Sequence, residues 1–305
     1  MGLLDGKVAV VTGAAHGLGR LHAINLAQQG ARVVVNDLGV DVEGVGADQS
    51  AAQKVVNEIA AAGGDAVAHY GDVASFPDAE ALVRKAVDHF GDLHILINNA
   101  GFTRDNLIYK MSEKDFDDVV RVHLKGHFAP SKFAMIHWRE RSKASGAPVY
   151  GRLLSTASES ALFGTPGQPN YAPAKAGILS LTMGLAQLGQ KLGVTANAVM
   201  PRARTRMTLK GPMGAIFQKP ESGFDNFDPA NSSPLFVYLC TPQAARISGH
   251  VFIVWGKEVK LIGRPEPRAT FTSQTPWSLE GLHEQLGPHF EKLEPVTDGF
   301  SVPPM

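Results

Sequence analysis

The stretch from Lys7 to Gly19, KVAVVTGAAHGLG, constrains the fold of this chain more than any other part of its sequence. Val8 to Val11 is a short apolar run typical of a buried parallel strand. Glycines at positions 13, 17 and 19 follow it, and a helical pattern then runs from Arg20 to Gln29. Glycine lets a backbone turn sharply and approach a ligand, and a helix start offers free N–H groups. The stretch therefore predicts either a pyrophosphate-binding loop or an ordinary strand-to-helix turn.

An acidic residue at the end of the next predicted strand favours the dinucleotide interpretation. The apolar run at residues 31–36 ends in Asp37, eighteen residues after Gly19. A carboxylate at this place can accept hydrogen bonds from an adenosine ribose and would repel a 2′-phosphate. The sequence therefore predicts NAD in preference to NADP as the cofactor.

The alternation of strand and helix patterns extends to about residue 255 and predicts a Rossmann-type, doubly wound α/β fold. We expect a parallel seven-stranded sheet with helices on both faces. The strands are expected near residues 7–12, 31–36, 65–70, 93–98, 149–155, 194–199 and 250–254. Residues 1–256 are predicted to form the NAD-binding catalytic domain, with a lid loop at about 201–228. The Pro-rich residues 257–305 form a C-terminal extension, which we expect to pack on its own domain or on a neighbouring subunit.

The chemistry is expected at the helix that begins with Tyr171. Tyr171 and Lys175 are one helical turn apart and project from the same face. A free tyrosine has a pKa of about 10, but a neighbouring ammonium and the positive ring of an oxidised nicotinamide both favour the phenolate. Ser158 can hydrogen-bond a substrate oxygen. Taken alone, a Tyr-x-x-x-Lys pattern is more often a surface pair; its combination with the other motifs predicts an active site.

Further polar positions follow other predicted strands. Asp72, in Gly71-Asp72-Val73, is either an adenine contact or a helix N-terminal acid. The stretch Asn98-Asn99-Ala100-Gly101 can link neighbouring strands and leave room for a ribose. In the predicted lid, Thr205 can bond a nicotinamide carboxamide. The apolar lid residues either line a substrate channel or pack on one another; they are Met207, Leu209, Met213, Ile216 and Phe217.

Taken together, these motifs resemble the short-chain dehydrogenase/reductase family over about residues 5–256. The stretches that carry the likeness are VVVNDLG (33–39), SAAQKVVNEI with AAGGDAVA (50–68), RVHLKGHF (121–128), GQPNYAPAKAGIL (167–179) and PRARTRMT (201–208). Within the family, the likeness is to the branch of (3R)-hydroxyacyl-CoA dehydrogenases found in peroxisomal multifunctional enzymes of type 2, also called 17β-hydroxysteroid dehydrogenase type 4, and in bacterial relatives.

The resemblance implies roles for individual residues. The implied catalytic residues are Ser158, Tyr171, Lys175 and His123, the last in place of the family's usual asparagine that helps to hold a proton-relay water. The implied cofactor-binding residues are Gly13, His16, Gly17, Leu18, Gly19, Asp37, Asp72, Val73, Asn99, Ala100, Gly101, Tyr171, Lys175 and Thr205. His16 stands where NADP-preferring relatives often carry a basic residue. The family's Pro-Gly after the sixth strand is Pro201-Arg202 here, so this loop is expected to be set differently.

The expected activity is NAD-dependent interconversion of a secondary alcohol and a ketone, with a (3R)-hydroxyacyl-CoA as substrate, including one with a steroid-derived acyl group. The alternatives are a dehydrogenase of free 17β-hydroxysteroids, a 3-oxoacyl-ACP reductase and a non-enzymatic NAD sensor. A basic patch at the lid would favour the CoA thioester. The residues that would supply it are Arg202, Arg204, Arg206 and Lys210.

Composition limits the partners and the compartment. Lys plus Arg and Asp plus Glu both number 29, without a basic block, so a nucleic-acid partner is not expected. His123 and His127 lie at i and i+4, but no acid or cysteine motif accompanies them, and we expect no metal site. There is no long apolar run for a membrane and no leader pattern, and the single Cys240 suits a reducing compartment. We therefore expect a cytoplasmic protein. By analogy with the family, we also expect a homodimer or homotetramer.

Overall fold

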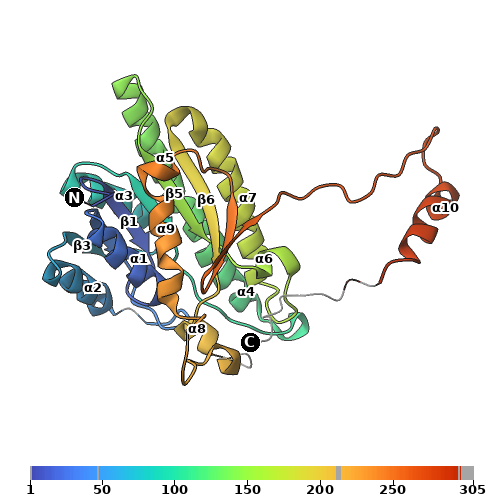
Figure 1. Cartoon of the computed structure of the whole chain (residues 1–305), viewed down its shortest axis with the longest axis horizontal. Helices are drawn as coiled ribbons and strands as arrows, with labels where there is room; N and C mark the ends of the chain where they lie inside the picture. Colours follow the sequence, from blue (N-terminus) through green and yellow to red (C-terminus); the bar gives the residue numbers. More distant parts are fainter. Residues whose placement is uncertain (1, 47, 211–213, 295, 297–305) are drawn as a thin grey trace. The chain divides into compact units, whose positions relative to one another are not determined.

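The computed structural model describes residues 2–46, 48–210, 214–294 and 296, and the eight strands within them form one sheet (Figure 1). Their order is β3-β2-β1-β4-β5-β6-β7-β8. The strands are β1 (Val8–Thr12), β2 (Arg32–Asn36), β3 (Ala66–His69), β4 (Ile95–Asn98), β5 (Gly151–Thr156), β6 (Val194–Pro201), β7 (Val251–Trp255) and β8 (Glu258–Ile262). Strands β1 to β7 are parallel, as predicted. The chain order reverses between β1 and β4, which is where α/β sheets of this kind bind ligands.

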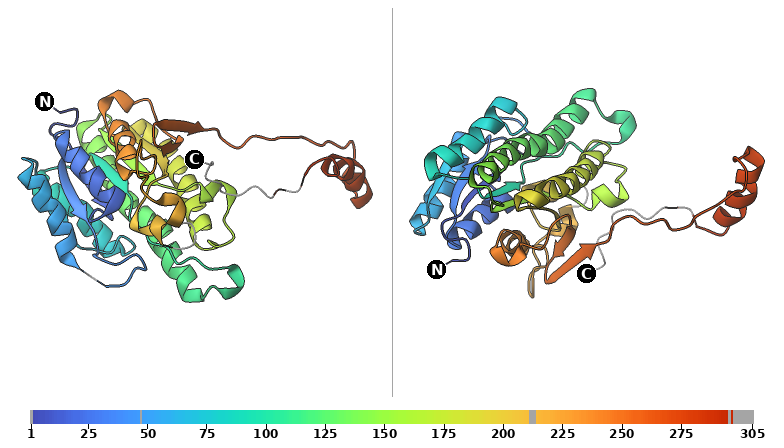
Figure 2. Two further views of the ribbon diagram at one scale, coloured as in Figure 1. Left: turned by 60° about the horizontal axis from the view of Figure 1, so that its bottom comes forward. Right: turned by 90° about the horizontal axis from the view of Figure 1, so that it is seen from above.

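Helices cover both faces of the sheet. They are α1 (Gly17–Gln28), α2 (Gln49–Ala61), α3 (Phe76–Phe90), α4 (Glu113–Val120), α5 (Gly126–Ser145), α6 (Ser160–Phe163), α7 (Tyr171–Gly189), α8 (Arg206–Leu209) and α9 (Ser233–Leu239). A π-helical turn, η2 (Arg121–Lys125), joins α4 to α5. The short 3₁₀ turns are η1 (Ile108–Lys110), η3 (Gln190–Leu192), η4 (Gly214–Phe217), η5 (Pro229–Asn231) and η6 (Pro242–Ala244). Helices α5 and α7 run side by side on one face (Figure 2).

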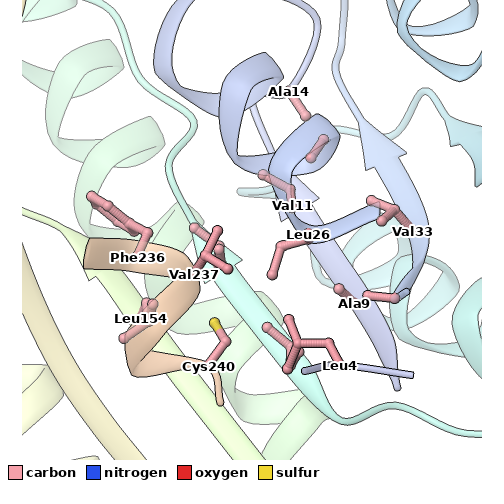
Figure 3. Packing of buried hydrophobic residues seen from close by; sticks show 14 of the residues in the cluster. Leu4, Ala9, Val11, Ala14, Leu26, Val33, Leu154, Phe236, Val237 and Cys240 are labelled. Carbon is pink, nitrogen blue, oxygen red and sulfur yellow. The ribbon is translucent and has the colours of Figure 1, made fainter. Parts of the chain in front are cut away.

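The hydrophobic core has two halves because successive strand residues point to opposite faces. On one face, Val11 and Val33 pack against α1 and α9, together with Leu26 and Phe236 (Figure 3). On the other face, the neighbouring strand residues pack against α3, α5 and α7, where Trp138 is fully buried. The continuous apolar runs of the sequence thus serve both halves, as expected for parallel strands covered on both sides.

The eighth strand is the one difference from the predicted sheet. β8 pairs antiparallel with β7, from Trp255↔Glu258 to Val251↔Ile262. The two-residue connection contains Gly256 at φ +55°, which suits a tight hairpin turn. β8 lies at the edge of the sheet and its side chains are largely exposed, so the strand has no apolar run that marks it in the sequence. Residues 258–262 therefore belong to the sheet and not to the extension.

Residues 1–262 form one compact unit and residues 263–305 a second, smaller one. Within the described part of the second unit, α10 (Leu279–Phe290) begins at Ser278, whose side chain accepts a hydrogen bond from the Gly281 N–H. The Phe271 and His289 rings meet edge to face at 5.0 Å. Leu279 remains 88% exposed, so the described residues of this unit do not form a core that covers this side chain.

Candidate active site

The loop between β1 and α1 has the close packing that requires glycine. Gly13 has φ +63°, and a Cβ there would lie 2.7 Å from the Ala100 Cα. A Cβ on Gly19 would lie 2.2 Å from the Gly13 carbonyl oxygen. Gly17, with φ +52°, faces the Thr205 side chain from the lid. The loop thus passes close to the end of β4 and leaves the first turn of α1 open toward the lid.

Thr12 and Asn99 fasten this loop to the end of β4. The Thr12 hydroxyl accepts hydrogen bonds from the backbone N–H groups of Asn99 (2.9 Å) and Ala100 (3.1 Å). The Asn99 side-chain amide donates to the carbonyls of Thr12 and Gly13, both at 3.1 Å. The Asn99 side-chain oxygen accepts from Thr156 of β5 at 3.4 Å. The amide therefore links three strands, which is the first of the two roles that the sequence allowed for it.

Asp37 lies at the tip of β2, as its position in the sequence predicts. Its carboxylate accepts hydrogen bonds from the N–H groups of Ala15 (2.9 Å) and Gly39 (2.8 Å). Asp37 therefore joins the glycine loop to the end of β2, and each oxygen keeps a further lone pair for a ligand. His16 is the N-cap of α1 and is largely exposed, and Leu18 lies in the first turn of that helix. Partial burial and the charge of Arg206 lower the pKa of His16.

Asp72 has structural partners on both carboxylate oxygens. One oxygen accepts from the Ala74 N–H at 2.9 Å, and the other pairs with Arg121 at 2.6 Å. The N-cap of α3 is Ser75, whose side chain accepts a hydrogen bond from the Asp78 N–H, and Asp72 lies three residues before this cap. Val73 is buried, and a Cβ on Gly126 would lie 2.7 Å from its side chain. The loop after β3 is therefore packed against the start of α5.

Asn170 positions the first turn of α7. Its side-chain oxygen accepts from the Tyr171 N–H at 2.7 Å, and its amide donates to the carbonyls of Arg104 (3.0 Å) and Asp115 (3.1 Å). Asn170 is fully buried. An asparagine before a helix is a common N-cap, so the sequence carries a signal for this residue although the predicted site did not include it.

Tyr171 and Lys175 project together from α7, as their spacing predicts. The Lys175 ammonium lies 5.4 Å from the centre of the Tyr171 ring and donates to the Thr156 carbonyl at 2.6 Å. Burial raises the pKa of Tyr171 to about 12, although a hydrogen bond with Ser158 lowers it. Burial also lowers the pKa of Lys175 to about 7. In the protein without cofactor, burial therefore has a larger effect on the Tyr171 pKa than the stabilisation of the phenolate that we expected from lysine.

Ser158 lies in the loop between β5 and α6, at the start of a chain of polar side chains. The Ser158 hydroxyl donates to the Ser160 hydroxyl at 3.3 Å, and Ser160 donates to the Gln168 side-chain oxygen at 3.0 Å. The Gln168 amide donates to Asp105 at 3.1 Å. Sequence spacing alone indicated Ser158 but none of the other members. Ser160 begins α6, Gln168 lies between α6 and α7, and Asp105 lies between β4 and η1.

His123 lies against Tyr171, inside the π-helical turn. Its Nε2 atom donates to the Phe102 carbonyl at 2.7 Å, and its ring meets the Tyr171 ring edge to face at 4.9 Å. Burial and the nearby Lys175 charge hold the pKa of His123 well below its usual range, so the ring is neutral. Gly101 makes room for the ring, because a Cβ there would lie 2.1 Å from the His123 Cε1 atom. These contacts suit His123 to orienting the Tyr171 ring better than to transferring protons.

The lid supplies apolar packing and one cofactor candidate, Thr205. Thr205 caps α8, and its hydroxyl accepts from the Thr208 N–H at 3.3 Å. Phe217 is buried and meets Phe227 edge to face at 4.9 Å, so it packs within the lid. Leu209 and Ile216 are more than one third exposed. Met213, another of the apolar lid residues predicted from the sequence, lies with residues 211 and 212 outside the described residues.

Three of the four basic residues expected to form a patch at the lid are paired with acidic side chains, so most of their positive charge is neutralised. Arg202 pairs with Glu159, Arg204 with Asp225, and Lys210 with Glu43. The acidic partners are distant in sequence, so the run of basic residues suggested a free charge that the fold does not leave. Among the described residues, no group of three His, Cys, Asp or Glu side chains is arranged to hold a metal ion. Nor does any described helix have the length and apolar character needed to cross a membrane.

The switch point of the sheet, the glycine loop and the Tyr171–Lys175 pair define a nicotinamide-dependent oxidoreductase with a doubly wound fold. Comparison with known proteins shows that the chain belongs to the short-chain dehydrogenase family, whose model matches residues 7–210. The protein is therefore a short-chain dehydrogenase that acts on CH–OH donors.

The relatives include a hydroxyacyl-CoA dehydrogenase and peroxisomal multifunctional enzymes. The chain is 42% identical over 298 residues to hydroxyacyl-CoA dehydrogenase ChsB1 of Mycobacterium tuberculosis, covering 96% of this chain and 91% of that one. It is 42% identical over 236 residues to mouse peroxisomal multifunctional enzyme type 2, covering 77% of this chain but only 30% of that enzyme. The structure matches a short chain dehydrogenase from Mycobacterium avium with a TM-score of 0.86 and 42% identity, covering 99% of this chain and all of the other.

Proposed function

We propose that the protein oxidises the 3-hydroxyl group of a (3R)-hydroxyacyl-CoA with NAD, using Tyr171 as the base. The observation that carries the proposal is the convergence of Ser158 and Lys175 on Tyr171, at the carboxyl end of the sheet. The names of the relatives support the thioester class, since this chain matches a hydroxyacyl-CoA dehydrogenase over nearly all of both lengths.

The glycine loop fits a dinucleotide. Gly13 and Gly19 permit a backbone packing that a side chain would prevent, and the start of α1 offers its N–H groups to a pyrophosphate. Asp37 would hold the adenosine ribose, and Asp72, Val73 and Asn99 would shape the adenosine side of the site. A nicotinamide bound in this site would supply the chemistry of hydride transfer.

Each catalytic side chain has a separate task. Tyr171 takes the hydroxyl proton, and Ser158 holds the substrate oxygen. Lys175 opposes the effect of burial on Tyr171 through its charge and would bind the nicotinamide ribose. His123 fixes the plane of the Tyr171 ring from its edge. Because the tyrosine, serine and lysine are held by packed elements, substrate and cofactor meet in a prepared geometry, which supplies much of the rate.

The acyl group and the thioester are tested by a substrate panel. Reduced nicotinamide is followed by absorbance with NAD and, in parallel, a (3R)-hydroxyacyl-CoA, its (3S) epimer, a free 17β-hydroxysteroid and a 3-hydroxyacyl carrier-protein thioester. We expect turnover only of the (3R) CoA thioester, including one with a steroid-derived acyl group. Turnover of the steroid or the carrier-protein thioester alone would establish the corresponding rival instead. Tyr171→Phe is the control: it should abolish turnover and leave NAD binding intact.

The preference for NAD is tested at Asp37. Asp37→Ala removes the carboxylate that would repel a 2′-phosphate, and it also removes the acceptor of the Ala15 and Gly39 N–H groups. We expect weaker NAD binding and a smaller difference between the Kd values of NAD and NADP. Asp37→Asn keeps an acceptor and separates the effect of charge from that of loop geometry. Unchanged discrimination in both variants would contradict the assignment.

We also propose a homo-oligomer. The outer surface of α4, η2, α5 and α7 contains a hollow of about 550 Å³, whose lining includes the apolar Leu124, Phe128 and Leu181 together with charged side chains such as Asp117 and Arg121. Phe128 is 42% exposed in the single chain. Light scattering should give the mass of a dimer or tetramer, and Phe128→Glu should lower that mass.

We further propose residues 1–262 as the catalytic domain with a separate extension after it. A cytoplasmic location is also proposed, since the only cysteine, Cys240, is buried and unpaired.

A further inference from the structure

A buried ion pair lies beside Ser158. Glu159, the next residue in the chain, accepts two hydrogen bonds from Arg202, at 2.6 Å from Nε and 2.8 Å from Nη2. The side chains are only 5% and 11% exposed. Such bidentate, charge-assisted contacts fix both the distance and the angle between two groups. Arg202 is also the residue that replaces the glycine expected after Pro201 in this family.

The same arginine stands at the start of the lid loop, which is called the base of the lid here, and contacts β7 there. The Arg202 N–H donates to the Val254 carbonyl at 2.9 Å, and its guanidinium lies 5.2 Å from the Trp255 ring. Trp255 lies 5.9 Å from Phe227, which belongs to the lid. The loop that carries Ser158 is thereby connected to β6, to β7 and to the lid through one residue, Arg202.

Stability alone does not account for such a pair. Removing two charges from water is costly, and well-packed apolar residues are often at least as stable as a buried ion pair. What an ion pair of this geometry adds is a defined position. The Ser158 hydroxyl needs one, because its described contacts with Ser160 are long, at 3.3 Å.

We infer that Glu159 and Arg202 are positioning residues, which hold the Ser158 hydroxyl toward Tyr171 and tie that loop to the base of the lid. The inference rests on the proposed catalytic roles of Ser158 and Tyr171. Neither member of the pair needs to touch the substrate. Its effect is expected in kcat and in the proton affinity of the tyrosine, and not in NAD binding.

The lid offers a matched control pair. Arg204 and Asp225 also form a double contact near the lid base, with the Nη1 atom 3.1 Å from Oδ1, and their side chains are 16% and 12% exposed. Asp225 lies within the lid loop and is not joined to the Ser158 loop. Glu159→Gln and Asp225→Asn therefore make the same chemical change on carboxylates of similar burial, only one of which adjoins the serine.

The experiment measures kcat, KM, the Kd of NAD and the pH profile of oxidation, using the best substrate of the panel. In Glu159→Gln we expect kcat to fall about 10- to 100-fold, as for a misplaced catalytic group, with the Kd of NAD within about twofold of wild type. Asp225→Asn should raise KM and leave kcat within about threefold.

The pH profile separates positioning from general damage. The hydrogen bond from Ser158 lowers the pKa of Tyr171, so its loss raises that pKa. The phenolate then forms at higher pH, and the acid limb of the oxidation profile in Glu159→Gln should move to higher pH. The other charged or titratable groups facing the tyrosine are Lys175, His123 and Asp105, which are unchanged in every variant.

Each outcome decides the matter. Equal kcat and pH profiles in Glu159→Gln and wild type would overturn the inference, as would equal losses in both variants without a pH shift. If Glu159→Gln does not fold, Arg202→Lys keeps the charge but loses the bidentate geometry and is expected to show the same kcat loss and pH shift. A wild-type protein silent with every substrate would overturn the proposed function and the inference together.

Discussion

Gly101→Ala should damage the site through His123. The added Cβ would lie 2.1, 2.7 and 2.8 Å from the Cε1, Nδ1 and Nε2 atoms of the His123 ring. The ring has little freedom to move, because its Nε2 atom is bound to the Phe102 carbonyl and its edge lies against Tyr171. The substitution therefore forces either the backbone after β4 or the imidazole out of place.

The magnitude follows from two contributions. Overpacking of a filled core costs about 1–3 kcal/mol of unfolding free energy. Loss of the His123–Phe102 hydrogen bond adds about 1 kcal/mol. The melting temperature of a domain of this size falls by about 2–4 °C per kcal/mol, so for a total loss of about 2–4 kcal/mol a decrease of about 4–16 °C is expected at fixed protein concentration. Because the Tyr171 ring loses its neighbour, kcat should fall about tenfold or more.

The assay is thermal unfolding together with steady-state kinetics, and two variants test the cause. Gly184→Ala on α7 has nothing within 4 Å of the new Cβ, so it should be neutral or stabilise by up to about 1 kcal/mol. His123→Asn in the Gly101→Ala background removes the clash and should recover at least about 1 kcal/mol. A Gly101→Ala protein with wild-type melting temperature and kcat would refute the reasoning.

Asn170 and His22 provide two further predictions. Asn170→Ala removes the cap of α7 and the hydrogen bonds of this side chain to two carbonyls. We expect the unfolding free energy measured in urea to fall by about 1–2 kcal/mol, together with a lower kcat. An unchanged kcat would show that Tyr171 is placed without the cap. Burial lowers the pKa of His22 to about 3, so between pH 6.5 and 3 the unfolded chain takes up a proton that the folded protein does not. The unfolding free energy therefore decreases as the pH falls, by up to about 1.4 kcal/mol per pH unit. In His22→Gln, the unfolding free energy measured in urea from pH 7 to 5 should depend less on pH. An equal slope of the unfolding free energy against pH in both proteins would contradict this.

The sequence predicted those features that depend on local pattern. The apolar runs of β1 to β7 are continuous because both faces of a parallel sheet are covered, so each was visible without knowledge of its neighbours. Tyr171 and Lys175 share a helical face by their spacing alone, and Asp37 follows a strand by its place in the chain. β8 was missed because an exposed edge strand of five residues has no apolar run to reveal it.

The electrostatic state of the site depended on contacts that no local pattern contains. Glu159 and Arg202 are 43 residues apart, and Arg204 and Asp225 are 21 apart, so the lid's basic residues appeared free until the fold placed acids beside them. The sign of the Tyr171 pKa shift was also a matter of tertiary structure, because burial raises this pKa more than the hydrogen bond with Ser158 lowers it.

The chain's own sequence thus determined the class of fold, the loop that can receive a dinucleotide and the residues available for proton transfer. Periodicity and glycine placement act within one element and its turn, and they are present before the chain folds. The tertiary structure alone decided which charges are neutralised, that His123 lies on the edge of Tyr171, and how the Ser158 loop is joined to the lid. Burial and pairing are properties of groups that meet only when distant segments pack together.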